Sequence, residues 1–186
     1  MFPQVLKIAS RTYGNFAILL AMTELAALKV IKSPIGKIAI GTTQSGVAQL
    51  EILPGGSRRV EFSDSAKAHR FSLDAADQIA EYFEGSRKTF SVPVAITGTT
   101  FQLAVWGQIS KLDFGEQKTY AELASAIGNP KAVRAVGGAV GANPVPLLVG
   151  CHRVLGSQRR ITGYSGGEGL ATKRWLLTFE QIEFKE

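Results

Sequence analysis

The sequence predicts an α+β fold, with a strand-rich N-terminal part and a mostly helical C-terminal part. Two observations support this. Residues 29–53 contain apolar and β-branched runs separated by the turn sequences Ser33-Pro34-Ile35-Gly36 and Thr43-Gln44-Ser45-Gly46. After residue 98, apolar residues recur at helical spacing, and capping residues and glycines divide the chain into short helices.

The same change of pattern divides the chain into domains. We expect an N-terminal α/β domain over residues 29–96 and a C-terminal domain over residues 97–186. Residues 1–28 precede them as an extension or first element of uncertain role. Their apolar stretch Phe16 to Leu28 is interrupted by Glu24 and is too short to span a bilayer, so we expect no membrane association.

The N-terminal domain should contain strands and one helix. Strands are expected from Val30 to Ile40, interrupted by the first turn, and from Val47 to Leu53. Ser72 to Glu84 has apolar residues at helical spacing, with Ser72 as a candidate cap and Gly85 as the stop. Phe90 to Ile96 should be extended.

The C-terminal domain should begin with two short helices. Phe101 to Ile109 has an amphipathic pattern. Thr119 and Glu122 form a capping-box sequence for a helix from Tyr120 to Ile127, which Gly128 should end.

A further helix should begin directly after this one. Asn129 is its expected cap, Pro130 its first residue, and Ala142 its approximate end. Two short helices joined by a tight Gly-Asn-Pro turn form a helix-turn-helix, a common way to present a helix to a DNA groove.

This last helix has almost no side-chain bulk. Its small residues are Ala132, Ala135, Gly137, Gly138, Ala139, Gly141 and Ala142. Glycines weaken a helix by about 1 kcal/mol each relative to alanine, so a tertiary contact must compensate. Close packing on a neighbouring strand is one explanation, and close approach to a nucleic-acid backbone in a narrow minor groove is the other.

The distribution of charge favours a nucleic-acid partner. The formal net charge is +6 and the isoelectric point is near 9.6. Between Glu122 and Glu168 there is no acidic residue, although five basic residues lie there: Lys131, Arg134, Arg153, Arg159 and Arg160. Uncompensated Lys and Arg bind phosphates, so this segment is the expected DNA-binding region. An apolar, glycine-rich core segment with little room for carboxylates is the alternative.

Cys151 is the only cysteine, and His152 and Arg153 follow it directly. A single thiol forms no internal disulfide, and it is compatible with a reducing cytosol. A base and a cation beside a thiol are the setting that lowers a cysteine pKa and yields a nucleophile. The alternative is a small buried hydrophobic residue.

Ordered motifs give the sequence a resemblance to the O6-alkylguanine-DNA alkyltransferases, also called methylated-DNA–protein-cysteine methyltransferases. The resemblance is dense from Thr100 to Glu180 and sparse before it, where Ser33-Pro34-Ile35-Gly36 matches best. The matching segments are Phe101-Gln102, Val105-Trp106, Gly115-Glu116 before Tyr120, Arg134-Ala135-Val136-Gly137, Asn143-Pro144-Val145-Pro146, Cys151-His152-Arg153-Val154, Gly163-Tyr164-Ser165-Gly166-Gly167, Lys173-Arg174-Trp175-Leu176-Leu177 and Glu180.

The resemblance implies a ribonuclease-H-like N-terminal domain and a winged-helix-like C-terminal domain with a helix-turn-helix. It also implies DNA repair by direct reversal of damage. Such proteins bind the minor groove, flip the damaged guanine out of the stack and move its O6 alkyl group irreversibly to their own cysteine. Each molecule is consumed in a single turnover.

The resemblance also implies roles for residues around the thiol. Cys151 would be the alkyl acceptor, His152 the base acting through a water, and Glu180 the group that holds the imidazole. Adjacent residues on an extended backbone point apart, so we expect a bridging water between Cys151 and His152. Tyr120 would donate to the departing guanine, and Asn143 would be the hinge between the DNA-binding helix and the cysteine strand.

Further residues are implied to contact DNA or the flipped base. Arg134 would enter the base stack and fill the gap, since a planar guanidinium stacks on bases. The other expected DNA-binding residues are Lys131, Tyr120, Ala135 and Gly137. The expected pocket residues are Val154, Tyr164, Ser165 and Gly166.

Two segments depart from the family pattern. Gly150 stands where the family usually has proline, and glycine there should loosen the backbone before the thiol. Glu168-Gly169 is an insertion of two residues before Lys173, which changes the spacing to Glu180.

We expect no metal and no cofactor. Some relatives hold a structural zinc in the N-terminal domain, where this chain offers only His69 and no cysteine. Nor is there a phosphate-binding glycine-lysine motif. The expected partner is double-stranded DNA containing O6-alkylguanine. The protein is expected to be a monomer in the cytoplasm, associated with the nucleoid, or nuclear in a eukaryote.

Two other functions compete with alkyl transfer. An alkyltransferase-like protein would bind the lesion without repairing it, but such proteins lack the cysteine. A helix-turn-helix regulator could use the thiol as a sensor, although no added regulatory domain is visible in the sequence.

Overall fold

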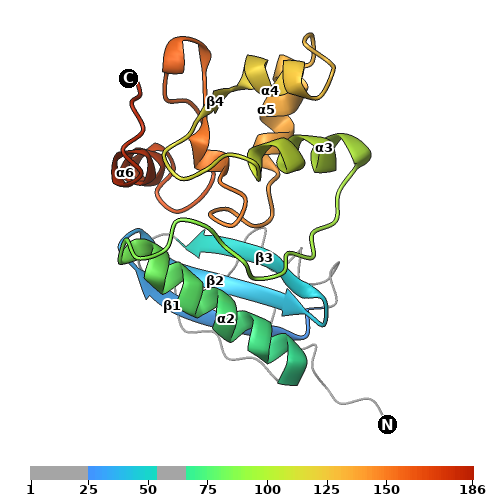
Figure 1. Ribbon diagram of the computed structural model, residues 1–186, viewed down its shortest axis with the longest axis vertical. Helices are drawn as coiled ribbons and strands as arrows, with labels where there is room; N and C mark the ends of the chain where they lie inside the picture. Colours follow the sequence, from blue (N-terminus) through green and yellow to red (C-terminus); the bar gives the residue numbers. More distant parts are fainter. Residues whose placement is uncertain (1–24, 54–65) are drawn as a thin grey trace.

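The computed structural model describes residues 25–53 and 66–186, so the expectations for residues 1–24 lie outside the described part (Figure 1). A small antiparallel sheet and one long helix form the N-terminal half, and short helices form the C-terminal half. The sheet has the order β1-β2-β3, with strands β1 (Ala27–Ser33), β2 (Gly36–Thr43) and β3 (Gly46–Leu53). The predicted strands are confirmed, and the predicted turns connect them.

The two hairpin turns are built in the same way. Ser33 Oγ donates to the carbonyl of Gly36 at 2.7 Å and accepts from the amide of Ile35 at 3.3 Å. Thr43 Oγ1 makes the corresponding bonds in the second turn. Gly36 and Gly46 have φ of +110° and +147°, a backbone conformation that favours glycine. Local hydroxyl-to-backbone bonds therefore explain why these turn sequences were visible in the chain.

Helix α2 (Ala66–Phe83) lies along one face of the sheet (Figure 1). It begins earlier than expected, and Ser72 is not its cap. Ser72 is buried inside the helix and its hydroxyl donates to the carbonyl of His69, a bond that a serine in a helix can make to the preceding turn. The predicted end is confirmed, because Gly85 has φ of +80° just after the helix.

Residues 90–96, predicted to be extended, make only one isolated bridge, between Val94 and Val47. The C-terminal half follows. Its elements are α3 (Thr100–Ile109), β4 (Lys118–Thr119), α4 (Tyr120–Ala126), α5 (Val133–Gly141), the 3₁₀ helix η1 (Cys151–Arg153), β5 (Val154–Leu155), the 3₁₀ helix η2 (Ser157–Arg159) and α6 (Leu170–Phe179).

Helix α4 confirms the predicted capping box. Thr119 Oγ1 accepts from the amide of Glu122, and the Glu122 carboxylate accepts from the amide of Thr119. Gly128, with φ of +74°, follows the helix as expected.

The predicted start of α5 is wrong by three residues. The helix begins at Val133, and the carbonyl of Asn129 accepts from the amide of Ala132 at 3.0 Å. This bond closes a four-residue turn with Pro130 at its second position, where proline is favoured. The turn therefore uses Asn129 and Pro130, and no side chain caps α5.

Loops of the C-terminal half pair with the outer edge of β3. The amide of Leu50 donates to the carbonyl of Pro144 at 2.8 Å, and the amide of Gly167 donates to the carbonyl of Ile52 at 2.9 Å. Buried side chains from both halves form one continuous core. Among the described residues, no helix is long and apolar enough to cross a bilayer.

Candidate active site and DNA-binding face

Cys151 and His152 lie on the single turn of 3₁₀ helix η1, not on an extended strand as we had expected. The amide of Arg153 donates to the carbonyl of Gly150 at 3.0 Å, and the amide of Cys151 donates to the carbonyl of Val149 at 2.7 Å. These short-range bonds coil the backbone immediately before β5. The successive side chains therefore point away from one another because of a helical turn.

The thiol of Cys151 is buried, and burial raises its pKa. The amide of Asn143 and the ammonium of Lys173 lower the pKa but only partly oppose burial. The expectation that neighbouring His and Arg lower the thiol pKa is therefore wrong for the resting protein. The charge of Arg153 is already paired with a carboxylate, as described next. The thiol is neutral until a base removes its proton.

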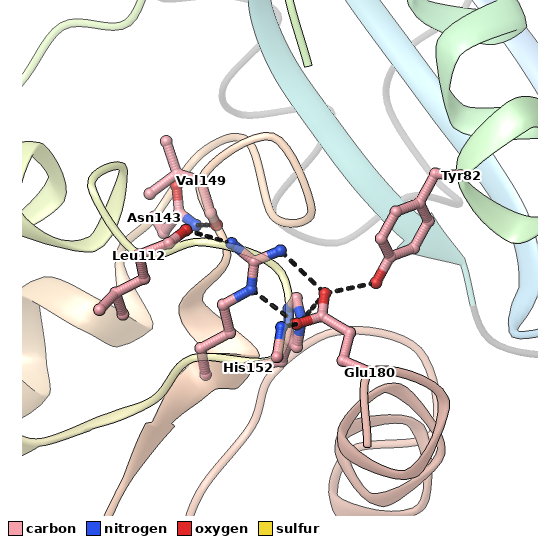
Figure 2. Close-up of polar contacts among 8 residues, drawn as sticks. Tyr82, Leu112, Asn143, Val149, His152 and Glu180 are labelled. Carbon is pink, nitrogen blue, oxygen red and sulfur yellow. Dashed lines mark hydrogen bonds and ion pairs between the residues drawn. The ribbon is translucent and has the colours of Figure 1, made fainter. Parts of the chain in front are cut away.

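Four side chains form a buried hydrogen-bonded group, here called the Glu180 cluster: Tyr82, His152, Arg153 and Glu180. Figure 2 shows the carboxylate of Glu180 at its centre. Arg153 Nε and Nη2 donate to the two carboxylate oxygens at 2.8 and 2.9 Å. His152 Nε2 lies 2.9 Å from Oε1, and the Tyr82 hydroxyl donates to Oε1 at 2.7 Å. The predicted contact between His152 and Glu180 is therefore present.

The charge state of Glu180 follows from these donors. Burial by itself would raise the pKa of Glu180, but the hydrogen bonds from His152 and Arg153 hold it far below its usual range. The carboxylate is therefore ionised and accepts hydrogen bonds without donating any.

An ionised Glu180 fixes the tautomer of His152. Burial lowers the pKa of His152, and Glu180 only partly opposes this, so the ring is neutral near pH 7. Since Glu180 only accepts, the proton of the neutral ring lies on Nε2. Nδ1 is then a free lone pair, and it makes no hydrogen bond to any described residue. The arrangement can accept a proton at Nδ1.

Two members of the cluster had no assigned role in the sequence. Arg153 was noted only as a cation beside the thiol, but it is buried and its Nη1 also donates to the carbonyl of Leu112 at 2.7 Å. Tyr82 lies 98 residues before its partner Glu180. Arg153 belongs to the matched segment Cys151-His152-Arg153-Val154, so its place in this segment could have indicated a structural role. No sequence signal indicated Tyr82.

Lys173 is a further buried cation beside the site. Its ammonium donates to the carbonyls of Val154 and Thr162 at 2.6 and 2.8 Å. Burial lowers its pKa to about 8. These bonds hold α6 against β5, and the remaining positive charge favours a thiolate at Cys151.

Asn143 connects α5 to the loop before the thiol, as expected for a hinge. Its Nδ2 donates to the carbonyl of Val149 at 2.8 Å, and its Oδ1 accepts from the amide of Val145 at 3.1 Å. Both bonds tighten the loop, in which Leu147 has φ of +75°. Asn143 therefore fixes the backbone that places Cys151.

The expected pocket residues differ in their exposure. Val154 is fully buried, Tyr164 and Gly166 are half-buried, and Ser165 is exposed. A Cβ at Gly166 would lie 3.0 Å from the Tyr164 ring, so this glycine lets the ring pack closely. Burial keeps the pKa of Tyr164 well above its usual range. Its hydroxyl lies beside the Cys151 thiol, within reach of a hydrogen bond to the sulfur.

The exposed side of α5, with the turn before it, forms a second site. It is here called the α5 face and consists of Lys131, Arg134, Ala135, Gly138 and Gly141. A Cβ at Gly138 or Gly141 would meet no atom within 4 Å, so internal packing does not require these glycines. Of the two explanations for the small residues, close approach by a partner is therefore favoured at both positions.

The opposite side of α5 packs into the protein. Val136, Ala139 and Val140 are buried, and Trp106 Nε1 donates to the carbonyl of Ala139 at 2.8 Å. Gly137 faces the ring of half-buried Tyr120, which a Cβ would approach to 4.0 Å. Gly137 therefore belongs to the contact between α4 and α5 more than to the exposed face.

Gly150 is adapted to its neighbour Arg153. A Cβ at this position would lie 3.0 Å from Cδ and Nε of Arg153, and that side chain is held by Glu180 and Leu112. Gly150 itself has φ of −68°, which proline also adopts. Glycine therefore leaves room for the guanidinium in this chain.

Two family models match the chain. Residues 27–96 match the ribonuclease-like domain of 6-O-methylguanine DNA methyltransferase, and residues 100–182 match its DNA-binding domain. A methylated-DNA–protein-cysteine methyltransferase of Methanosarcina barkeri is 39% identical over 153 residues, which cover 82% of this chain and 95% of the relative. The chain belongs to this methyltransferase family. The expected fold class and the resemblance are confirmed.

Other members of the methyltransferase family agree. The constitutive enzyme of Bacillus subtilis is 47% identical over 113 residues, covering 61% of this chain and 68% of the relative. The solved structure of Mycobacterium tuberculosis O6-methylguanine methyltransferase is 36% identical, with a TM-score of 0.71 over 83% of this chain and 92% of that chain. A structure of Mycobacterium tuberculosis OGT in complex with DNA gives a TM-score of 0.72 at the same identity and coverage. The chain is thus a DNA-binding repair enzyme that transfers an alkyl group to cysteine.

Proposed function

We propose that this protein repairs O6-alkylguanine in double-stranded DNA by transferring the alkyl group to Cys151, once per molecule. The observation that supports this most directly is that the only cysteine of the chain is followed by a neutral histidine with a free Nδ1, whose Nε2 is held by a buried carboxylate. Such an arrangement generates a thiolate on demand, as a base and an orienting acid do in a catalytic triad.

The transfer proceeds by proton removal and displacement. Nδ1 of His152 takes the thiol proton of Cys151 through a water, and Glu180 stabilises the imidazolium. The thiolate attacks the alkyl carbon, so a carbon–sulfur bond forms while the carbon–O6 bond breaks. The electron pair goes to the guanine, to which Tyr120 donates. The resulting thioether is a poor leaving group, so Cys151 is not regenerated.

The α5 face is proposed to bind the minor groove. Arg134 enters the stack in place of the flipped guanine, while Lys131 contacts phosphate. Ala135, Gly138 and Gly141 let the DNA backbone approach α5. Asn143 then joins this helix to the loop that presents the thiol.

The flipped guanine is proposed to lie against Val154, Tyr164, Ser165 and Gly166. One observation supports this pocket: the Tyr164 hydroxyl lies beside the Cys151 thiol, within reach of a hydrogen bond to the sulfur. A base held there would lie next to the thiol.

We also propose a monomer with domains over residues 29–96 and 97–186. The donors to Glu180 are supplied within the chain, so the cluster needs no group from a second copy. Because DNA is the partner, the protein should work where cellular DNA lies, in the cytoplasm of a prokaryote or the nucleus of a eukaryote.

Incubation with a duplex containing O6-methylguanine labelled in the methyl group tests the proposal. Stoichiometric transfer of label to the protein is expected, and intact mass should increase by one methyl group. Cys151→Ala should remain unlabelled while still binding the duplex. Ser110→Ala, at an unrelated serine after α3, is the matched control and should label normally.

Unlabelled wild-type protein that still binds the lesion would contradict alkyl transfer. More than one adduct per chain after reaction with a benzylated guanine would contradict Cys151 as the single acceptor.

A further inference from the structure

Tyr82 brings a group from the N-terminal domain into the Glu180 cluster. It lies near the end of α2, which packs on the sheet, whereas its partner Glu180 directly follows α6. The hydroxyl donates to Glu180 Oε1 at 2.7 Å across the boundary between the two domains (Figure 2). Both side chains are almost fully buried, so water does not compete for this bond.

The ring of Tyr82 is held by other aromatic rings. It contacts Phe83, Phe90, Phe114 and Phe179, with ring centroids 5.1 to 6.0 Å apart. Phe90 comes from the N-terminal domain, while Phe114 and Phe179 come from the C-terminal domain. These contacts fix the ring without help from the hydroxyl, so a phenylalanine at position 82 would occupy the same place. The hydroxyl therefore has a separable function.

The hydroxyl shares one carboxylate oxygen with the histidine. Oε1 of Glu180 accepts from Tyr82, from His152 and from Nη2 of Arg153. Each donor withdraws negative charge from the oxygen that stabilises the protonated imidazole. Burial, and then the charge of Glu180, raise the pKa of Tyr82 far above its usual range, so the hydroxyl remains a donor under all working conditions.

We propose that Tyr82 is a positioning residue through which the N-terminal domain lowers the basicity of His152, by donating to the carboxylate that the imidazole contacts. The proposal rests on the proposed role of His152 as the base. Without the hydroxyl, Oε1 would accept two hydrogen bonds and stabilise the imidazolium more strongly. His152 would then be protonated at higher pH and would be unable to accept the thiol proton there.

Other charged and titratable groups also face His152. On η1 this is Arg153, and on α6 and just after it they are Lys173 and Glu180. Arg153 and Lys173 disfavour the imidazolium and Glu180 favours it. A change from tyrosine to phenylalanine leaves all of these groups in place. Any change in titration would therefore report the lost hydroxyl.

Proton NMR titration of the imidazole resonances in Tyr82→Phe is the direct test. The chain has two histidines, so His69 on α2 serves as an internal reference. The pKa of His152 should rise by about half a unit. The low-pH limb of the single-turnover transfer rate should move to higher pH by the same amount, so transfer below the limb should be about threefold slower.

Phe83→Leu is the matched control, because Phe83 also packs on Trp175 and Phe179 but contributes no polar atom. It should lower the melting temperature without moving the His152 titration. An unchanged His152 titration in Tyr82→Phe, or an equal shift in Phe83→Leu, would overturn the proposal. A shift in Tyr82→Phe together with no alkyl transfer by the wild type would instead support the coupling and reject the proposed function.

Discussion

The Glu180 cluster and the α5 face use polar and small residues in opposite ways. In the cluster, Tyr82, His152 and two nitrogens of Arg153 all donate to one buried carboxylate, that of Glu180. On the α5 face, Lys131 and Arg134 are exposed, and Gly138 and Gly141, which follow them, border open space. The cluster is complete within the chain, whereas the face is suited to a partner from outside.

This difference predicts how substitutions at the two sites will affect function and stability. In the cluster, chemistry and stability depend on the same bonds, so both should fall together. On the α5 face, DNA binding and stability should change independently, or even in opposite directions. The following substitutions test this contrast.

Glu180→Gln should have the largest effect. It leaves Arg153 as an uncompensated buried charge, so the free energy of unfolding should fall by about 3 kcal/mol. Transfer should slow by at least about 100-fold, because the imidazolium loses its counter-charge. Chemical denaturation and single-turnover kinetics measure the two effects. Glu183→Gln, an exposed neighbour, should change neither. If Glu180→Gln slowed transfer but kept the free energy of unfolding of the wild type, the expected difference between the cluster and the α5 face would be contradicted.

Arg134→Ala should slow transfer from duplex DNA about tenfold, since stacking on a base is worth about 1–3 kcal/mol. The loss should be far smaller with free benzylated guanine, and the melting temperature should stay unchanged. Arg134→Lys should not restore the rate, because an ammonium does not stack. Lys131→Ala should mainly reduce the salt dependence of DNA binding. An equal loss on the free base would contradict the stacking role.

The pH dependence of stability should report His152. Because burial lowers its pKa in the folded state, the unfolded chain binds this proton more tightly. The stabilisation is therefore present above the unfolded pKa and is lost as pH falls below it, by at most about 1.4 kcal/mol per pH unit. His152→Gln keeps a donor for Glu180 but does not titrate, so its unfolding free energy should fall less steeply below pH 6.5. Parallel curves for the two proteins would contradict this assignment.

Gly138→Ala should have the smallest effect, and it should change stability and DNA affinity in opposite directions. Alanine favours the helix by about 0.5–1 kcal/mol, and its Cβ would meet nothing within 4 Å, so the protein should become more stable. The added methyl group should weaken duplex binding a few-fold. Calorimetry and a titration with labelled DNA measure the two quantities. Unchanged DNA affinity would remove Gly138 from the α5 face.

Features with short-range causes were predictable from the sequence. The capping box of Thr119 and Glu122 and the hydroxyl-bonded turns at Ser33 and Thr43 are made by residues a few positions apart. The predicted start of α5 was wrong because two local structures compete for the same residues. Asn129 and Pro130 favour a turn as well as a helix start, and the structure has the turn.

The electrostatics of the site could not be predicted in the same way. Its proton affinities depend on burial and on a carboxylate shared among distant residues. The sequence placed a base and a cation beside Cys151 but did not show that Glu180 already neutralises Arg153. Nor did it show that Tyr82 completes the group. The raised thiol pKa follows from burial, which only the folded chain reveals.

The pairing of β3 with Pro144 and Gly167 also affects how the chain must be made. During synthesis the sheet emerges from the ribosome well before these partners, leaving its outer edge without them. Unpaired strand edges invite association with other chains. Until residues 144–167 arrive, nascent copies on one messenger are therefore exposed to edge-to-edge association. Association of nascent chains through this edge should therefore compete with folding until residues 144–167 have been made.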